Sequence, residues 1–112
     1  MLRVVLIVDD EPLILSLTSA MLEALGCEVL SADSGADALA QLAVDSRVGL
    51  LLTDIQMPEM SGYELAAEAR RRWPELTIAV MSGNDLGGHG YAVVRKPFSQ
   101  PQLAQVVDAT WN

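Results

Sequence analysis

Strand-like and helix-like segments alternate along this chain of 112 residues with almost no linker between them. Apolar runs indicate strands at residues 3–8, 27–31, 48–53, 76–81 and 91–94. Most of the intervening segments, and the segment after the last run, carry apolar residues three and four positions apart, as amphipathic helices do. This alternation predicts an α/β fold, a doubly wound parallel sheet of five strands with helices on both faces. Residues 48–53 are nearly all apolar, which is typical of a central strand.

Local signals mark where the predicted helices begin and end. Pro12 opens the first helix and Gly26 stops it, whereas Ser34 caps the second. Ser61 with Glu64 forms a capping-box pattern for the third helix, which stops at Trp73 and Pro74. The same pattern, Ser99 with Gln102, opens the last helix. There is no repeat or low-complexity tract, so residues 1–112 are interpreted as one domain.

Composition excludes several classes of function. The formal charge of −8 argues against direct binding of nucleic acid, because phosphate contacts need a basic face. The basic cluster Arg70–Arg72 falls at a predicted helix end, where cations favour the helix dipole. The longest apolar run is far shorter than a membrane span, so we expect no membrane insertion. A single cysteine, Cys27, and a predicted strand that starts already at Arg3 favour a cytoplasmic protein.

Polar residues stand at the ends of four of the predicted strands. They are Asp9, Asp10, Asp54, Ser82 and Lys96. Lys96 is the only lysine in the chain, and the other basic residues are all arginine apart from His89. In doubly wound folds the carboxyl ends of parallel strands meet at one rim, where ligands bind. We therefore expect the carboxylates and the ammonium group to converge there.

Each of these residues also has an ordinary structural explanation. Asp9, Asp10 and Glu11 could form a turn that caps the first helix. Asp54 favours a cation site instead, because carboxylates brought close together must take up a proton or a cation. Oxygen ligands alone favour Mg²⁺, which keeps several waters and uses one or two carboxylates and substrate phosphate. His89 stands alone in a glycine-rich stretch and is interpreted as a solvated loop residue.

A carboxylate beside Mg²⁺ can act as a nucleophile toward phosphorus and form an aspartyl phosphate. The transferring group needs positioning and positive charge, which Mg²⁺ and the Lys96 ammonium would supply. The Ser82 hydroxyl could donate to a phosphoryl oxygen, although alone it would be an ordinary strand-to-loop residue. Lys96 alone would likewise be an exposed loop lysine.

Four sequence motifs resemble the receiver domains of bacterial two-component response regulators, over essentially the whole chain. They are Val8-Asp9-Asp10-Glu11, Thr53-Asp54-Ile55-Gln56-Met57-Pro58-Glu59-Met60-Ser61-Gly62, Met81-Ser82-Gly83 and Lys96-Pro97-Phe98. The resemblance implies a flavodoxin-like sheet with strand order 2-1-3-4-5, a topology for which a chemotaxis receiver is a known example.

The resemblance also implies roles for individual residues. Asp54 would take a phosphoryl group from a sensor histidine kinase or a histidine phosphotransfer protein. Asp10, Asp54 and the backbone carbonyl of Gln56 would bind Mg²⁺ directly, and Asp9 through water. Ser82 and Lys96 would then contact the phosphoryl group and bias the domain between two conformations, which changes its protein interactions.

The chain departs from the family pattern between Ser82 and Lys96, which only thirteen residues separate. Residues 83–90 are too few for a usual helical crossover, and four of the eight are glycine. We expect the family's fourth helix to be missing or reduced to a loop, with output through a non-standard surface. The position of the family's switch aromatic is Val93 here. Tyr91 has the same parity along the strand and could replace it, or could be a core or edge tyrosine.

Two other classes of function stay open. A Mg²⁺-dependent phosphohydrolase with an aspartate nucleophile usually has a second aspartate two residues on, where this chain has Gln56. A phosphorylation-independent protein-binding module would use residues 83–90 as its surface. The leading hypothesis is a phosphoacceptor domain rather than a turnover enzyme. The sequence leaves open whether it is stand-alone or part of a hybrid kinase, and whether it forms a homodimer.

Overall fold

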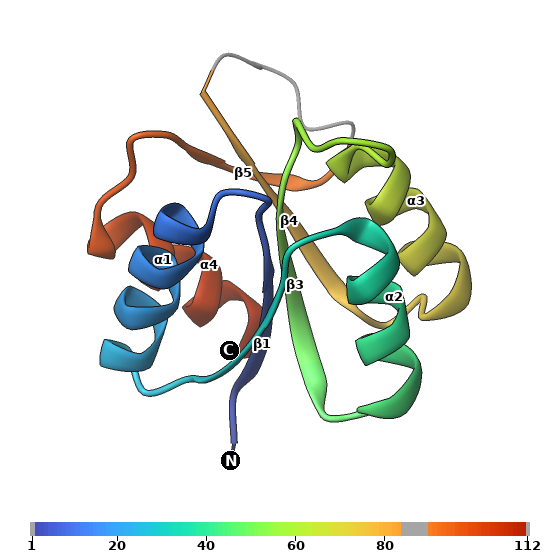
Figure 1. The fold of residues 1–112 in the computed structure, drawn as a ribbon. Coiled ribbons are helices and arrows are strands. Elements are labelled where there is room, and N and C mark those ends of the chain that lie inside the picture. Colours follow the sequence, from blue (N-terminus) through green and yellow to red (C-terminus); the bar gives the residue numbers. More distant parts are fainter. Residues whose placement is uncertain (1, 84–89, 112) are drawn as a thin grey trace.

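The computed structural model describes residues 2–83 and 90–111, which form a five-stranded parallel sheet between two layers of helices (Figure 1). In chain order the elements are β1 (Val4–Val8), α1 (Pro12–Ala24), β2 (Glu28–Ala32), α2 (Gly35–Val44), β3 (Val48–Asp54), α3 (Gly62–Arg72), β4 (Thr77–Ser82), β5 (Ala92–Arg95) and α4 (Gln100–Trp111). The strand order is β2-β1-β3-β4-β5. The expected fold class and strand order are confirmed.

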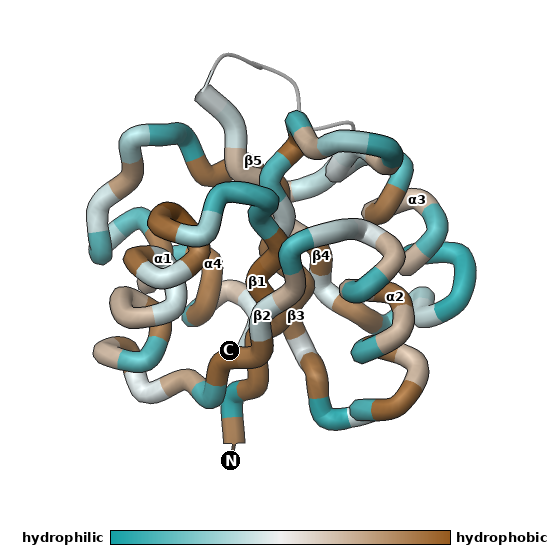
Figure 2. Tube along the Cα trace, in the orientation of Figure 1, coloured by the Kyte–Doolittle hydropathy of each residue, from teal (hydrophilic) through white to brown (hydrophobic). Residues whose placement is uncertain are grey.

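Two apolar cores lie on the two faces of the sheet. On one face, side chains of β1, β3 and β4 pack against Leu22 of α1 and Leu103 of α4. On the other face, alternate residues of the same strands pack against Leu42 of α2 and Leu65 of α3. Every residue of β1 is buried, as expected for an inner parallel strand covered on both sides. Figure 2 shows these inner strands as the most hydrophobic part of the chain.

The helices start at the predicted signals, and only the capping box predicted for α4 is incomplete. Ser61 and Glu64 form a complete capping box, since the Ser61 side chain accepts from the Glu64 N–H and the Glu64 carboxylate accepts from the Ser61 N–H. Ser34 caps α2 by accepting from the Asp37 N–H. At α4 only one half of the box is present, in which the Gln102 side chain accepts from the Ser99 N–H.

The predicted missing helix between β4 and β5 falls on residues 84–89, which lie outside the described residues, so it stays a prediction. Tyr91, just before β5, is partly buried at the edge of the core that α2 and α3 cover. The Arg70 guanidinium lies over its ring, 5.4 Å from the centroid. Ala92 pairs with Ala79, which is three residues before Ser82 in β4. Tyr91 precedes Ala92, so it lies beside the part of β4 that is distant from Ser82. The interpretation of Tyr91 as an edge tyrosine agrees with this packing.

No helix within residues 2–83 and 90–111 has the length and apolar character needed to cross a membrane. Cys27 is buried and free. Arg71 and Arg72, at the end of α3, both pair with Glu68. The basic cluster is therefore partly neutralised within its own helix.

Candidate functional site

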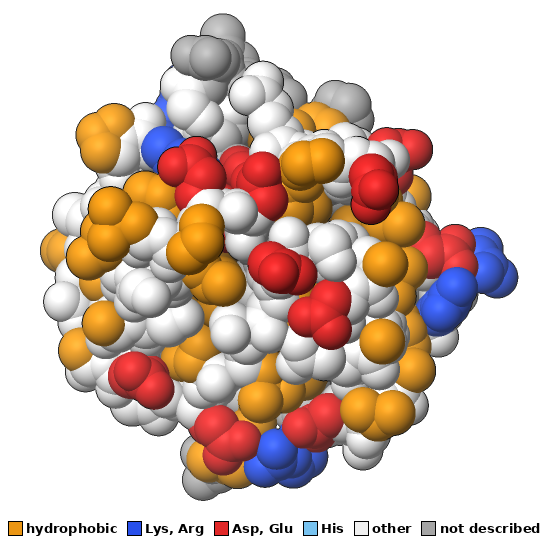
Figure 3. Space-filling view, in the orientation of Figure 1, with side chains coloured by type: hydrophobic (Ala, Val, Ile, Leu, Met, Phe, Trp, Pro, Cys, Tyr) orange, Lys and Arg blue, Asp and Glu red, His pale blue; other side chains and the backbone are white. Residues whose placement is uncertain are grey.

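The carboxyl ends of the strands bring the predicted site residues to one rim of the sheet. Asp9 directly follows β1, and Lys96 directly follows β5. Asp54 and Ser82 were expected just after their strands, but each is the last residue of its strand. The strands extend this far because Asp54 still pairs with Met81, and Ser82 with Arg95. Figure 3 shows acidic side chains gathered at this upper edge.

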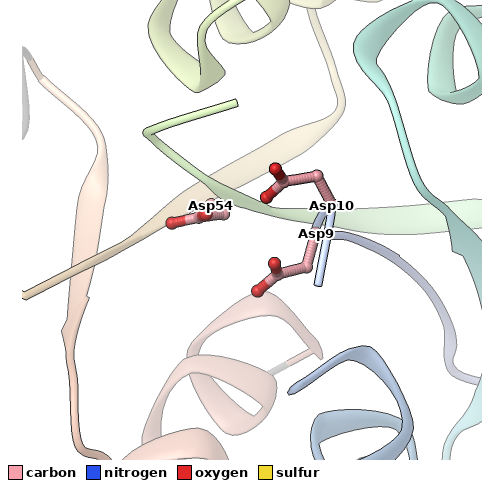
Figure 4. Close-up of side chains that lie close together, drawn as sticks. All are labelled: Asp9, Asp10 and Asp54. Atoms are coloured by element: carbon pink, nitrogen blue, oxygen red, sulfur yellow. The ribbon is translucent and has the colours of Figure 1, made fainter. Parts of the chain in front are cut away.

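Three carboxylates form a cluster at the rim. One oxygen from each of Asp9, Asp10 and Asp54 lies within 4.8 Å of the other two. Figure 4 shows Asp9 and Asp10 leaving the end of β1 beside Asp54 at the end of β3. Asp9 and Asp54 are buried, whereas Asp10 is more accessible to solvent. The expected convergence of the three aspartates is therefore present in the structure.

The carboxylate of Asp9 is fully buried, with 0% of the residue exposed. Its Oδ1 accepts a hydrogen bond from the Glu11 N–H at 3.0 Å. Its Oδ2 accepts no hydrogen bond from the residues that the structure describes. Burial raises the pKa of Asp9 above its ordinary value, because the Glu11 N–H and the charge of Lys96 offset that cost only in part and the charge of Asp54 adds to it.

The ammonium group of Lys96 reaches two of the three carboxylates. Its Nζ donates to Oδ1 of Asp54 at 3.1 Å and lies 3.5 Å from Oδ2 of Asp9. Burial by itself would lower the pKa of Lys96, but the hydrogen bond to Asp54 and the two negative charges outweigh it and raise that pKa. The backbone N–H of Lys96 donates to the Ser82 carbonyl at 2.7 Å, and the Lys96–Pro97 peptide bond is cis.

A pocket of about 410 Å³ opens at the rim. Its lining residues are Glu11, Asp54, Ile55, Gln56, Met81, Ser82, Gly83 and Lys96. The predicted site residues Gln56, Ser82 and Lys96 thus share one cavity with Asp54. Asp9 and Asp10 belong to the carboxylate cluster around Asp54.

The donor set at the rim suits a hard divalent cation. Three clustered carboxylates supply oxygen ligands only, and one buried oxygen of Asp9 lacks a hydrogen-bond donor among the described residues. A buried carboxylate oxygen without a hydrogen bond is costly unless a cation or proton compensates it, and Lys96 at 3.5 Å does so only in part. Mg²⁺ prefers such ligands and also keeps several waters, for which the pocket has room. The residues present therefore fit the predicted metal.

Some residues of the site were not predicted from the sequence. Glu11 lines the pocket, and its N–H fixes the Asp9 carboxylate in the manner of an Asx-turn. The turn itself was one of the interpretations of the sequence, because Asp9 stands two residues before Glu11, the N-cap of α1. The Ile55 N–H donates to Oδ1 of Asp54 at 2.9 Å. That bond depends on the loop conformation, and no sequence pattern predicts it.

The comparisons with known proteins agree with the fold and show the family. The family model of the response regulator receiver domain matches residues 5–108. Sensor protein GacS of Pseudomonas syringae pv. syringae is 35% identical over 120 residues, which cover 92% of this chain and 13% of GacS. Several other curated relatives are also much longer, and the chain spans a quarter of their length or less.

Solved structures show the same architecture. A response regulator receiver domain protein from Clostridium thermocellum superposes with a TM-score of 0.91 at 26% identity, covering 97% of this chain and 94% of that chain. The receiver domain of sensor histidine kinase PA1611 from Pseudomonas aeruginosa, solved with a magnesium ion coordinated in its active site cleft, gives a TM-score of 0.88. It is 24% identical and covers 98% of both chains, so this likeness shows the fold alone.

Fold and site together define a flavodoxin-like α/β domain with an acidic pocket and a lysine at the carboxyl ends of its strands. The chain belongs to the response regulator receiver domain family, the signalling domain of two-component systems.

Proposed function

We propose that residues 1–112 form one phosphoacceptor domain in which Asp54 receives a phosphoryl group from a phosphohistidine. Oδ1 of Asp54 already accepts hydrogen bonds from the Ile55 N–H and Lys96 Nζ, so Oδ2 is assigned as the attacking oxygen. The new O–P bond forms as the P–N bond to the donor histidine breaks. The imidazole nitrogen leaves with the electron pair and takes up a proton.

Asp10, Asp54 and the Gln56 carbonyl would hold Mg²⁺, with Asp9 binding it through water. When bound, the metal ion would neutralise charge on the carboxylates and on the phosphoryl oxygens. Lys96 lies within reach of the same oxygens because it already contacts Asp54. Ser82 lines the same pocket, where its hydroxyl can donate to a phosphoryl oxygen. Such positioned charge is what phosphoryl transfer needs most.

The single observation that carries this proposal is the juxtaposition of Lys96 with the carboxylate cluster. Nζ of Lys96 is 3.1 Å from Oδ1 of Asp54, although the two residues are 42 positions apart. A lysine that only adds charge to the surface would extend into solvent, whereas the ammonium group of Lys96 lies between two buried carboxylates. Its placement leaves one positive group facing the oxygens where a phosphoryl group would be attached.

The test is incubation with Mg²⁺ and acetyl phosphate, followed by mass spectrometry of the intact protein and its peptides. We expect one phosphoryl group on Asp54 that requires Mg²⁺ and is absent in Asp54→Ala. Rapid consumption of acetyl phosphate without labelled protein would instead indicate the phosphohydrolase alternative. No labelling and no consumption would indicate a protein-binding module.

An apolar groove beside the pocket is suited to the phosphodonor protein. It has a volume of about 410 Å³ and is lined by Ile14, Leu17, Thr18, Met21, Lys96, Pro97 and Phe98. Lys96 lines both cavities, so a donor whose histidine reaches Asp54 would also lie over the groove. Leu13 and Leu17 of α1 are 71% and 54% exposed, and Figure 3 shows hydrophobic side chains over this helix. We assign the groove to an apolar surface of a histidine kinase or phosphotransfer protein.

A paired measurement separates docking from chemistry. Leu17→Asp should slow transfer at least tenfold from any phosphorylated histidine phosphotransfer protein that labels the wild type, because a charge would be buried in the contact. Labelling by acetyl phosphate should not change. Val44→Asp is the control, because Val44 is 84% exposed on α2 away from the groove. Equal slowing with both phosphodonors, or none with either, would contradict the assignment.

A further inference from the structure

The loop between β3 and α3, residues 55–61, carries the Gln56 carbonyl, and its two ends are held at Asp54 and Ile55. At its start the Ile55 N–H donates to the Asp54 side chain. At its end the Gly62 N–H donates to the Ile55 carbonyl at 2.8 Å. A Cβ on Gly62 would overlap the Asp54 carbonyl and lie 2.8 Å from Cα of Ile55. The first residue of α3 therefore packs against the backbone of the proposed phosphoacceptor, with no space for a side chain.

The middle of this loop rests on a different helix. Met60 lies over Gly35, the buried first residue of α2. A Cβ on Gly35 would be 2.5 Å from Sδ, 3.1 Å from Cγ and 3.2 Å from Cβ of Met60. Only Sδ, near the flexible end of the side chain, would overlap with the new Cβ, whereas Cγ and Cβ would be in tight contact with it. A rotation of the Met60 terminus relieves the overlap with Sδ but leaves the contacts with Cγ and Cβ, which require Met60 itself to shift by a few tenths of an ångström. The Met60 N–H also donates to the Pro58 carbonyl at 2.7 Å, which couples the side chain to a tight turn.

We propose that Gly35 is a positioning residue for the metal-binding segment Asp54–Gln56, and that it acts through Met60. This inference rests on the proposed function, because it concerns the oxygens assigned to Mg²⁺. A side chain at position 35 would push Met60 and, with it, the loop that carries the Gln56 carbonyl. Gly35 lies within α2 and does not have a positive φ, so alanine should favour the helix itself. Gly35→Ala should therefore stabilise α2 while it weakens the binding of Mg²⁺.

The experiment is a calorimetric titration of Mg²⁺ into the wild type and Gly35→Ala. We expect Gly35→Ala to bind Mg²⁺ roughly tenfold more weakly, as is typical when a group that orients a metal ligand is disturbed. The same variant is examined by NMR without metal, where the amide signals of Ile55 and Gln56 should shift. Unchanged affinity together with unchanged amide signals would overturn the inference.

Gly49→Ala provides a matched control for lost stability. A Cβ on Gly49 would lie 2.8 Å from Cζ2 of Trp111, so the overlap is of the same kind. Gly49 lies at the start of β3, at the opposite end of the strand from Asp54. Gly49→Ala should lower the melting temperature and leave Mg²⁺ affinity and the Ile55 amide signal within error of the wild type. A tenfold loss of affinity in this control would attribute the Gly35 effect to general destabilisation and overturn the inference.

A double-mutant cycle tests whether Met60 transmits the effect. Met60→Ala removes Sδ and Cγ, the two atoms closest to a Cβ at position 35, and leaves only Cβ at 3.2 Å. In that background, adding Gly35→Ala should change Mg²⁺ affinity less than twofold. An undiminished effect in that background would contradict the route through Met60. A wild type that binds no Mg²⁺ would refute the proposed metal site, whereas the amide shifts in metal-free protein would still decide the role of Gly35.

Discussion

At the scale of single residues, the site contains a buried carboxylate, that of Asp9, whose hydrogen bonds are incomplete. The Asp9 carboxylate is fully buried, and one of its oxygens accepts no hydrogen bond among residues 2–83 and 90–111. Burial raises its pKa, which means that the ionised form is disfavoured in the folded protein. Lys96 compensates the charge only in part, from 3.5 Å. The metal-free protein therefore carries an electrostatic cost that a bound cation would remove.

Neutralising Asp9 should stabilise the metal-free protein. Asp9→Asn keeps the shape and the acceptor for the Glu11 N–H but removes the buried charge, so we expect the free energy of unfolding to rise by about 1 kcal/mol. Urea denaturation in EDTA measures it. Added Mg²⁺ should stabilise the variant less than the wild type. A variant less stable than the wild type in EDTA would contradict this view of Asp9.

The site residues differ in how far the sequence could predict them. Asp9, Asp54 and Lys96 stand at the ends of apolar runs, and parallel strands bring such ends to one rim. The packing of Met60 against Gly35 could not be predicted, because it joins two residues that are 25 positions apart in the sequence. The hydrogen bond from the Ile55 N–H likewise depends on how the loop folds back onto Asp54.

At the scale of secondary structure, local signals predicted element bounds to within about one residue. Four strands, β2 to β5, end one residue later than predicted. At β3 and β4 pairing with a neighbouring strand continues past the apolar run. Hydrophobic pattern cannot detect that continuation, since Asp54 and Ser82 are polar. Of the two predicted capping boxes, the one at α3 is complete and the one at α4 is half formed.

The two caps should therefore differ in energy. Ser61→Ala removes a side chain that accepts from the Glu64 N–H at 3.1 Å, so we expect a loss of about 1 kcal/mol of stability. Ser99→Ala should cost clearly less, because the Gln102 N–H donates to the Ser99 carbonyl rather than to its hydroxyl. Urea denaturation of both variants checks this. Equal losses would show that sequence pattern, and not the observed bonding, determines the energy of the cap.

The end of α3 makes a prediction about pH. Hydrogen bonds from Arg71 and Arg72 lower the pKa of Glu68 from 4.5 to about 2. A carboxyl whose pKa is lowered by folding stabilises the fold above its unfolded value, and that contribution is lost as the pH falls from about 4.5 towards 2. Carbon-13 NMR of the Glu68 carboxyl should show a midpoint well below 4.5. A midpoint at the ordinary value would mean that these exposed ion pairs are not populated in solution.

At the scale of the whole molecule, the alternation of strands and helices and the resemblance to receiver domains together predicted the sheet order, which the structure confirms. In a parallel sheet the carboxyl ends of all strands lie at the same edge. The acidic cluster, the only lysine of the sequence and the pocket lie at that edge here. An apolar groove adjoins that rim. The part of the family pattern that concerns residues 84–89, and with it the route of signal output, stays a prediction.

Binding of Mg²⁺ at the rim is the central claim, and a calorimetric titration of the wild type and Asp10→Asn tests it most directly. We expect one site in the wild type and affinity at least tenfold weaker in the variant, because Asp10 is an accessible carboxylate of the cluster and its charge would be lost. Under saturating Mg²⁺ the melting temperature of the wild type should also rise, because the ion binds only the folded protein. A wild type that takes up no Mg²⁺, or a variant that binds it equally well, would contradict the account.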